Sequence, residues 1–159
     1  SMPNTPAAVG RGATVAVPNP HVTSAMRATA ERLLGAVGDV HWVRDEGLLD
    51  AVTALSGGGP AYVFLLVESL AAAGRSVGLD EATANALARE TIIGAGALLG
   101  EFAEPPSELR RQVTSPGGTT AAALDVLMSA GGMPDLMRKA VEAAAWRGAE
   151  LAKEAEKKG

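Results

Sequence analysis

The chain has 159 residues, of which 47% are hydrophobic, so it is long and apolar enough for one globular domain with its own core. The net charge of -4, with no cluster of Lys or Arg, argues against a nucleic-acid partner. Without cysteine the chain has no disulfide, no thiolate nucleophile and no cysteine-bound zinc, and it suits a reducing cytoplasm.

Two further classes are not expected. His21 and His41 lie far apart without a carboxylate pattern, so a metal site is not predicted. No apolar stretch in the sequence reaches the roughly 18 residues of a membrane span, so a membrane partner is not predicted. We expect a cytoplasmic protein.

Residues 1–44 have the pattern of a β-α-β unit. Residues 13–17 are β-prone, and residues 21–37 carry apolar side chains at helical spacing up to Gly38. Residues 40–43 are a second strand candidate. Two short strands do not make a stable sheet alone, so we expect the remnant of an α/β Rossmann domain.

Residues 45–159 contain only predicted helices, so the fold class is mainly α, a helical bundle preceded by the β-α-β remnant. The segment 60–76 is apolar nearly all round and should be buried, against a second subunit. The other helices are expected at 46–55, from Asp80 to about Gly100, at 107–112, at 115–130, and from Pro134 to a charged, solvated end at 153–158.

The run from Thr114 to Thr120 is the strongest candidate for a site. Ser115 is a suitable N-cap, and Pro116 then falls at the first helical position. Two glycines follow, and each destabilises a helix by roughly 1 kcal/mol relative to alanine. We expect an anion site at the free N–H groups of Gly117, Gly118 and Thr119, with the hydroxyls of Thr119 and Thr120 beside it. The alternative is a tight turn that feeds a helix.

Three stretches together resemble the pyrroline-5-carboxylate reductase family, in the family's order and spacing. They are Met2–Pro6, Asp50–Phe64 and Gln112–Thr120. The resemblance implies an N-terminal Rossmann domain that binds NADPH or NADH and an all-helical domain that forms a homodimer or a higher oligomer. Residues 1–44 would be the end of the first domain and residues 45–159 the dimerisation and substrate-binding domain. The family's glycine-rich cofactor loop is expected upstream of these residues.

The resemblance also implies the reaction, which is hydride transfer to the C=N carbon of 1-pyrroline-5-carboxylate to give proline, the last step of proline biosynthesis. The N–H groups of Gly118, Thr119 and Thr120 would hold the substrate carboxylate, and the Thr120 hydroxyl would relay a proton to the ring nitrogen. The implied substrate-binding residues are Glu46, Ser115, Gly117, Gly118, Thr119 and Thr120; Thr120 is also the catalytic residue, and Asn4, Thr5 and Gln112 are the cofactor-binding residues.

Each assignment has an alternative. Glu46 is also favoured at a helix N-terminus by the dipole. Asn4–Pro6 can be a simple turn. Ser56–Pro60 is more typical of a tight connection between two helices than of a binding site. Gly58 stands where the family usually carries serine, so any role of that hydroxyl is in doubt.

Two other functions stay open. The chain can be a non-catalytic dimerisation module, because it contains no candidate loop for a dinucleotide's phosphates. It can also be an unrelated helical protein that binds a small acid. We predict that the 159-residue chain by itself dimerises without reducing substrate.

Overall fold

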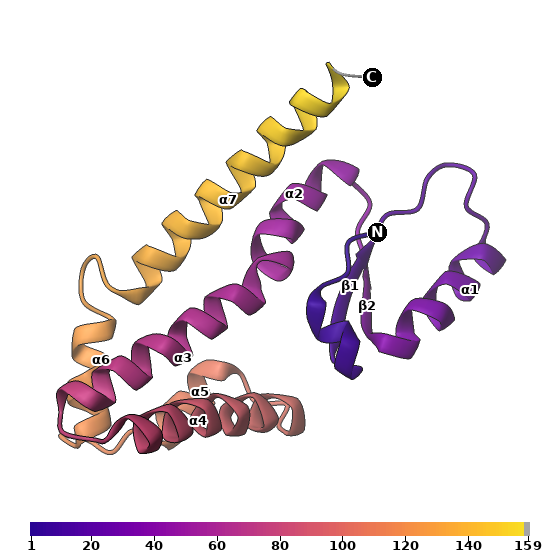
Figure 1. Cartoon of the computed structure of the whole chain (residues 1–159). Coiled ribbons are helices and arrows are strands. Elements are labelled where there is room, and N and C mark those ends of the chain that lie inside the picture. Colours follow the sequence, from indigo (N-terminus) through magenta and orange to yellow (C-terminus); the bar gives the residue numbers. More distant parts are fainter. Residues whose placement is uncertain (158–159) are drawn as a thin grey trace. The chain divides into compact units, whose positions relative to one another are not determined.

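The computed structural model describes residues 1–157 and divides into two compact units (Figure 1). Unit 1 combines Ser1–Tyr62 with the end of the chain from Arg138, and unit 2 is Val63–Met137. Lys158, the last residue of the predicted charged end, lies outside the described residues. The division at residue 45 into two evolutionary domains stays a prediction.

The predicted β-α-β unit is confirmed within unit 1. Strand β1 (Gly12–Ala16) pairs in parallel with strand β2 (Gly38–Trp42), and helix α1 (Ser24–Leu34) connects them (Figure 1). Helix α1 begins later than predicted, because the Thr23 hydroxyl accepts from the Met26 N–H at 3.2 Å and so caps the helix there. Met2 adds an antiparallel bridge to Val15 on β1.

Glycine is required where the two strands start. Gly38 has φ +147°, a conformation that residues with a side chain rarely adopt, and a Cβ there would collide with the backbone of Gly12. Gly12 is itself crowded by Ala7, 2.9 Å from where its own Cβ would lie. The close approach of these backbones sets the register, in which Gly12 faces Gly38.

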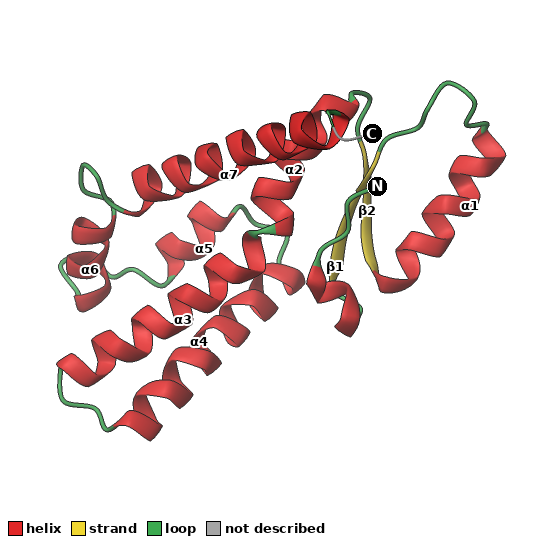
Figure 2. Ribbon diagram, turned by 45° about the horizontal axis from the view of Figure 1, so that its top comes forward, coloured by secondary structure: helices red, strands yellow, loops and turns green. Residues whose placement is uncertain are grey.

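The helical run that follows is more irregular than predicted. A 3₁₀ turn (η3, Glu46–Leu48) leads into helix α2 (Leu49–Val52), a π-helical turn (η4, Thr53–Gly57) and helix α3 (Gly59–Ser76) (Figure 2). A further 3₁₀ turn, η1, covers Thr5–Val9, and η2 covers Gly35–Val37. Helix α3 begins one residue before Pro60, which still lies in the first turn, where a helix needs no N–H.

The remaining helices are α4 (Glu81–Glu101), α5 (Pro106–Gln112), α6 (Thr119–Leu127) and α7 (Met133–Glu156). The Asp80 carboxylate caps α4 as predicted, since it accepts from the Thr83 N–H at 3.0 Å. Gly78, with φ +103°, lies in the loop that ends α3. Helices α3 and α4 approach closely at Gly74, where an added Cβ would lie 3.3 Å from the Ala84 methyl group.

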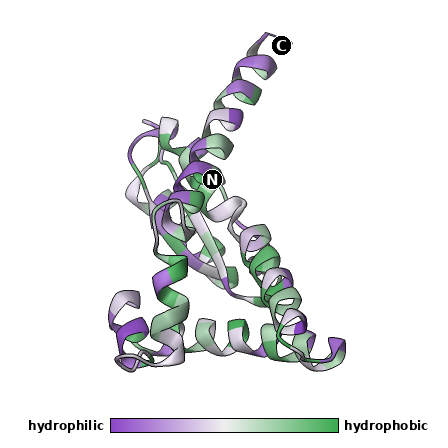
Figure 3. Ribbon diagram, turned by 90° about the vertical axis from the view of Figure 1, so that its left-hand side faces the viewer, coloured by the Kyte–Doolittle hydropathy of each residue, from purple (hydrophilic) through white to green (hydrophobic). Residues whose placement is uncertain are grey.

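The buried residues of these helices are small. Within the described residues, the fully buried helical positions of unit 2 are Ala71, Ala84 and Ala88, whereas Phe64 is 63% and Leu65 61% exposed. Hydrophobic residues, green in Figure 3, recur along the helices. Segment 60–76 is therefore largely exposed within the described chain, and its expected burial against a second subunit stays a prediction.

The backbone at Gly38 generates a stability prediction. Gly38→Ala should destabilise the protein by more than about 2 kcal/mol, from the strained φ and the collision with Gly12. Gly35→Ala is the matched control, because Gly35 has φ -64° and open space around its Cβ position. Urea unfolding followed by circular dichroism measures both variants, and equal midpoints would contradict the account.

A second prediction concerns the cap of α4. Hydrogen bonds from Thr83 hold the pKa of the Asp80 carboxyl below its ordinary value, so the ionised carboxylate stabilises the folded state. That stabilisation is present above the carboxyl's unfolded pKa, near 4, and is lost as the pH falls through the lower folded value. Asp80→Asn keeps the cap without titrating. Its unfolding midpoint should fall less steeply with acid below about pH 4, and parallel curves for the two proteins would count against the cap.

Candidate functional site

The run 115–118 forms a tight turn, which is the alternative named above. The Gly118 N–H donates to the Ser115 carbonyl at 3.0 Å, and Gly117 at the third position has φ +69°. Proline at the second position and glycine at the third are typical of a type II turn. The assignment of Ser115 as N-cap is wrong, because Gly118 is the N-cap residue and α6 begins at Thr119.

The turn changes which N–H groups are free. The Gly118 N–H is used within the turn, and the first donor of the helical ladder is Ala122, which reaches the Gly118 carbonyl at 3.1 Å. The N–H groups of Thr119, Thr120 and Ala121 precede that donor, so they lie at the positive end of the helix dipole. Thr119 and Thr120 are exposed, so their N–H and hydroxyl groups are open to a ligand.

Gln112 ends α5, three residues before the turn, and shares an acidic partner with Arg111. Its Nε2 donates to Glu108 at 3.4 Å, while two nitrogens of Arg111 donate to the two oxygens of the same carboxylate at 2.8 and 2.6 Å. The Arg111 guanidinium holds the pKa of Glu108 below its usual range, and Glu108 raises the pKa of Arg111. Gln112 is exposed, and the hydrogen bond from its Nε2 to Glu108 defines which way its amide group is turned.

Glu46 lies in the first turn of the helical run, where the dipole favours a carboxylate. Asp45 caps this turn by accepting from the Gly47 N–H at 2.8 Å. Glu46 itself is exposed. Its position fits the dipole alternative, and its role toward the substrate stays a prediction.

Asn4 is not a simple turn residue. Its Nδ2 donates to the Ser56 hydroxyl at 3.1 Å and to the Ser56 carbonyl at 3.3 Å, and its Oδ1 accepts from the Ala13 N–H at 2.8 Å. The first two stretches of the family resemblance therefore meet within unit 1, through residues that are 52 apart in the chain. Thr5 begins η1 directly after Asn4, with an exposed side chain.

Sequence reasoning missed two contacts, that of Ser56 with Asn4 and that of Tyr62 within the helical run. The Tyr62 hydroxyl donates to the Ala54 carbonyl at 2.9 Å, and it lies 2.6 Å from where a Cβ of Gly58 would be. The phenol thus occupies the space of a side chain at position 58. The signal in the sequence was Pro60, whose missing N–H frees the carbonyl of Ser56 four residues earlier.

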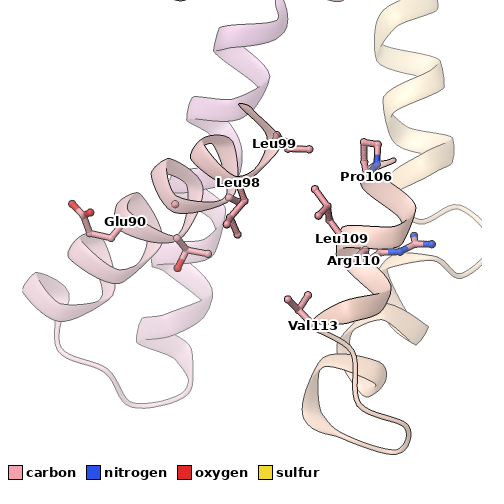
Figure 4. Close-up of a pocket in the computed structure, with 10 residues that line it drawn as sticks. Glu90, Leu98, Leu99, Pro106, Leu109, Arg110 and Val113 are labelled. Carbon is pink, nitrogen blue, oxygen red and sulfur yellow. The ribbon is translucent and has the colours of Figure 1, made fainter. Parts of the chain in front are cut away.

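Helices α4 and α5 of unit 2 enclose an apolar groove of about 550 Å³ (Figure 4). Leu98 on α4 and Leu109 and Val113 on α5 point into it. No set of catalytic groups converges there within the described lining. Its lining residues are Glu90, Thr91, Gly94, Ala95, Leu98, Leu99, Pro106, Leu109, Arg110 and Val113.

The predicted site residues fall into two groups. Asn4, Thr5 and Glu46 belong to unit 1, whereas Gln112 and the 115–120 segment belong to unit 2, and each group is defined within its own unit. Among residues 1–157, no group of three or more His, Asp or Glu side chains could hold a metal ion.

The structure contains one helical run that is long and apolar, against expectation. The helical run Glu46–Ser76 has 31 residues and a mean hydropathy of 1.3 in its most apolar window, which is long and apolar enough to cross a membrane. The expectation that no stretch reaches this length is wrong, because the irregular turns at 46–57 continue directly into α3. Length and composition alone are weak evidence, since interface helices of soluble proteins share them.

Comparison with known proteins decides the family. The family model for pyrroline-5-carboxylate reductase dimerisation matches residues 46–151. The chain belongs to the pyrroline-5-carboxylate reductase dimerisation family. A Pseudomonas aeruginosa pyrroline-5-carboxylate reductase is 45% identical over 96% of the chain, and an Arabidopsis thaliana reductase is 45% identical over 94%. The chain spans about half the length of these curated relatives, 56% and 54% respectively.

Solved reductase structures share the fold. A pyrroline-5-carboxylate reductase from Coxiella burnetii matches with a TM-score of 0.89 and 43% identity over 94% of this chain and 55% of its own. A Plasmodium falciparum pyrroline carboxylate reductase, solved with NADP bound, matches with a TM-score of 0.79 and 35% identity over 92% of this chain and 59% of its own. The predicted fold class, mainly α after a β-α-β remnant, is confirmed.

The crowding at Gly58 predicts that a serine at that position destabilises this protein. Gly58→Ser should displace the Tyr62 phenol from the Ala54 carbonyl and destabilise the protein by about 1 kcal/mol. In a Tyr62→Phe background, which lacks that hydroxyl, the same substitution should cost less. A double-mutant cycle by urea unfolding measures the coupling, and fully additive effects would show that the phenol does not occupy this space.

Proposed function

We propose that the protein carrying this chain is a pyrroline-5-carboxylate reductase, which reduces the C=N bond of 1-pyrroline-5-carboxylate to give L-proline in the cytoplasm. The observation that carries the proposal is the 115–118 turn, which leaves the first N–H groups of α6 open. Reductases from bacteria and plants align along nearly the whole chain, which supports the same assignment.

The substrate's carboxylate is the group that the turn suits. The N–H groups of Thr119 and Thr120 would donate to it at the positive end of α6. Because the Gly118 N–H is used by Ser115, we propose Ala121 as the third donor in its place. Gly117 and Gly118 would let the carboxylate approach the backbone, and the Ser115 hydroxyl would stand beside it.

Thr120 is the proposed catalytic residue. Reduction of the imine carbon must be matched by a proton at the ring nitrogen, and the Thr120 hydroxyl can hold and relay that proton. Fixing the carboxylate two bonds from this nitrogen orients the imine, and orientation is a large part of what a protein can contribute to such a reaction. Glu46 belongs to unit 1 and stays a proposed substrate-binding residue on the ground of the family resemblance alone.

The cofactor would be NADPH or NADH, which supplies the hydride. The resemblance implies three cofactor-binding residues. Two of them, Thr5 and Gln112, suit this role because their polar side chains are exposed. The Asn4 amide fits less well, because its Nδ2 already donates to Ser56. The groups that would hold the cofactor's phosphates are not among the residues assigned here.

The chain by itself is proposed to form a homodimer. Several large apolar side chains of α3 and α4 are more than half exposed, among them Phe64, Leu65, Leu87 and Ile93, and exposed apolar surface of this kind is typical of subunit interfaces. The groove between α4 and α5 adds to that surface. This observation also supports the second candidate, in which the 159-residue chain acts as a dimerisation module without catalysis.

The test of the reductase activity is oxidation of NADPH by the full-length protein, dependent on added pyrroline-5-carboxylate. Thr120→Val, which removes the hydroxyl and keeps the shape, should lower kcat about 100-fold or more and raise KM less. Thr120→Ser should recover most of the rate. Wild-type activity in Thr120→Val would remove the hydroxyl from the mechanism.

The test of the dimer is the light-scattering mass of the 159-residue chain, expected at twice 16.0 kDa. Phe64→Glu should shift this mass toward the monomer, because it places a charge in the proposed interface. Val9→Glu is the control, since Val9 is 77% exposed but lies on η1. A wild-type monomer at high micromolar concentration would contradict the proposal.

A further inference from the structure

The π-helical turn η4 leaves a gap in the backbone ladder between α2 and α3. In an α-helix the Ser56 carbonyl would accept from the N–H of residue 60, but that residue is proline. The next N–H, of Ala61, donates to Gly58 at 3.0 Å. The Ser56 carbonyl therefore needs a partner from outside the helix, since half-buried carbonyls are rarely left unpaired.

Asn4 supplies that partner. Its Nδ2 lies 3.3 Å from the Ser56 carbonyl oxygen and 3.1 Å from the Ser56 hydroxyl. The opposite side of the amide accepts from the Ala13 N–H at 2.8 Å, next to the first residue of β1. A backbone N–H only donates and a carbonyl only accepts, so these two partners define which way the amide is turned.

The donor atom of the amide is engaged at this junction. Nδ2 lies within hydrogen-bond distance of two acceptors, and both belong to Ser56, 52 residues away in the chain. Although Asn4 is the N-cap residue of η1, its side chain makes no capping bond there. The contacts of the Asn4 side chain instead connect Ala13 of β1 with Ser56 of η4.

Two further contacts close the same junction. The Met2 methyl group lies 2.7 Å from where a Cβ of Gly57 would be, so Met2 packs over η4. Met2 is also bridged to Val15 of β1 by hydrogen bonds of 2.8 and 3.0 Å. The segment 2–5 is thus held between the strand and the π-helical turn.

We infer that Asn4 is a positioning residue for the proposed reductase reaction and does not itself bind the cofactor: it holds the 2–5 segment against η4 and orients the Ser56 hydroxyl. Because that hydroxyl accepts from Asn4, its own proton is free to donate to a bound molecule. The inference rests on the proposed function. It assigns Ser56 a role that the sequence pattern alone did not indicate.

The test uses Asn4→Asp in the full-length protein, which keeps the acceptor for Ala13 and removes the Nδ2 donor to Ser56. We expect kcat with pyrroline-5-carboxylate to fall about tenfold or more, with the NADPH dissociation constant from fluorescence titration within about twofold of wild type. Asn19→Asp is the matched control, because the Asn19 side chain only accepts from the His21 N–H in an exposed turn. A loss of NADPH affinity as large as the loss of kcat/KM would make Asn4 a direct ligand and overturn the inference.

A second readout separates this inference from the proposed function. Hydrogen exchange of the 54–58 amides should accelerate in Asn4→Asp and stay unchanged in Asn19→Asp. Ser56→Ala combined with Asn4→Asp should lower kcat no further than the lower single variant, since both act through one hydroxyl. A wild-type protein without reductase activity would contradict the proposed function, whereas unchanged exchange at 54–58 would contradict the Asn4 junction.

Discussion

The main constraint on this chain is that its helices carry more large apolar side chains than one chain can cover. Close contact between helices falls on alanine and glycine, as at Gly74 against Ala84, while Phe64, Leu65 and Ile93 stay open to solvent. Small residues allow helices to approach closely, but they remove little apolar surface from water. We propose that a second copy of the chain covers α3 and α4, which agrees with the dimerisation family to which the chain belongs.

The second structural theme is local irregularity where the resemblance motifs lie. Pro60 removes a backbone donor, and a π-helical turn lies just before it, at Thr53–Gly57. The side chains of Asn4 and Tyr62 donate to the carbonyls of Ser56 and Ala54. At the other motif, Ser115–Gly118 folds into a turn that consumes one N–H and presents the next three. In both places a break in regular structure leaves polar groups that a ligand or a side chain can use.

Much of the architecture could be predicted from residue patterns. The β-α-β order, the Asp80 cap and the presence of α4 and α5 follow from the spacing of apolar residues and from the glycine, proline and capping residues between helices. The start of α6 could not, because Ser115-Pro116 fits an N-cap and a type II turn equally well, and only the φ of Gly117 separates them. The exposure of α3 in a single chain agrees with the expected cover by a second subunit but does not test it. The Asn4–Ser56 junction is a pairing across 52 residues, which no local pattern reveals.

The central claim is that the open N–H groups at the start of α6 bind the carboxylate of the substrate. Titration of the isotope-labelled 159-residue chain with L-proline, the proposed product, tests it most directly by amide chemical shifts. The account predicts the largest shifts at Thr119, Thr120 and Ala121, and much smaller ones with L-prolinamide, which lacks the carboxylate. Shifts that fall elsewhere, or that are equal for the two ligands, would contradict it.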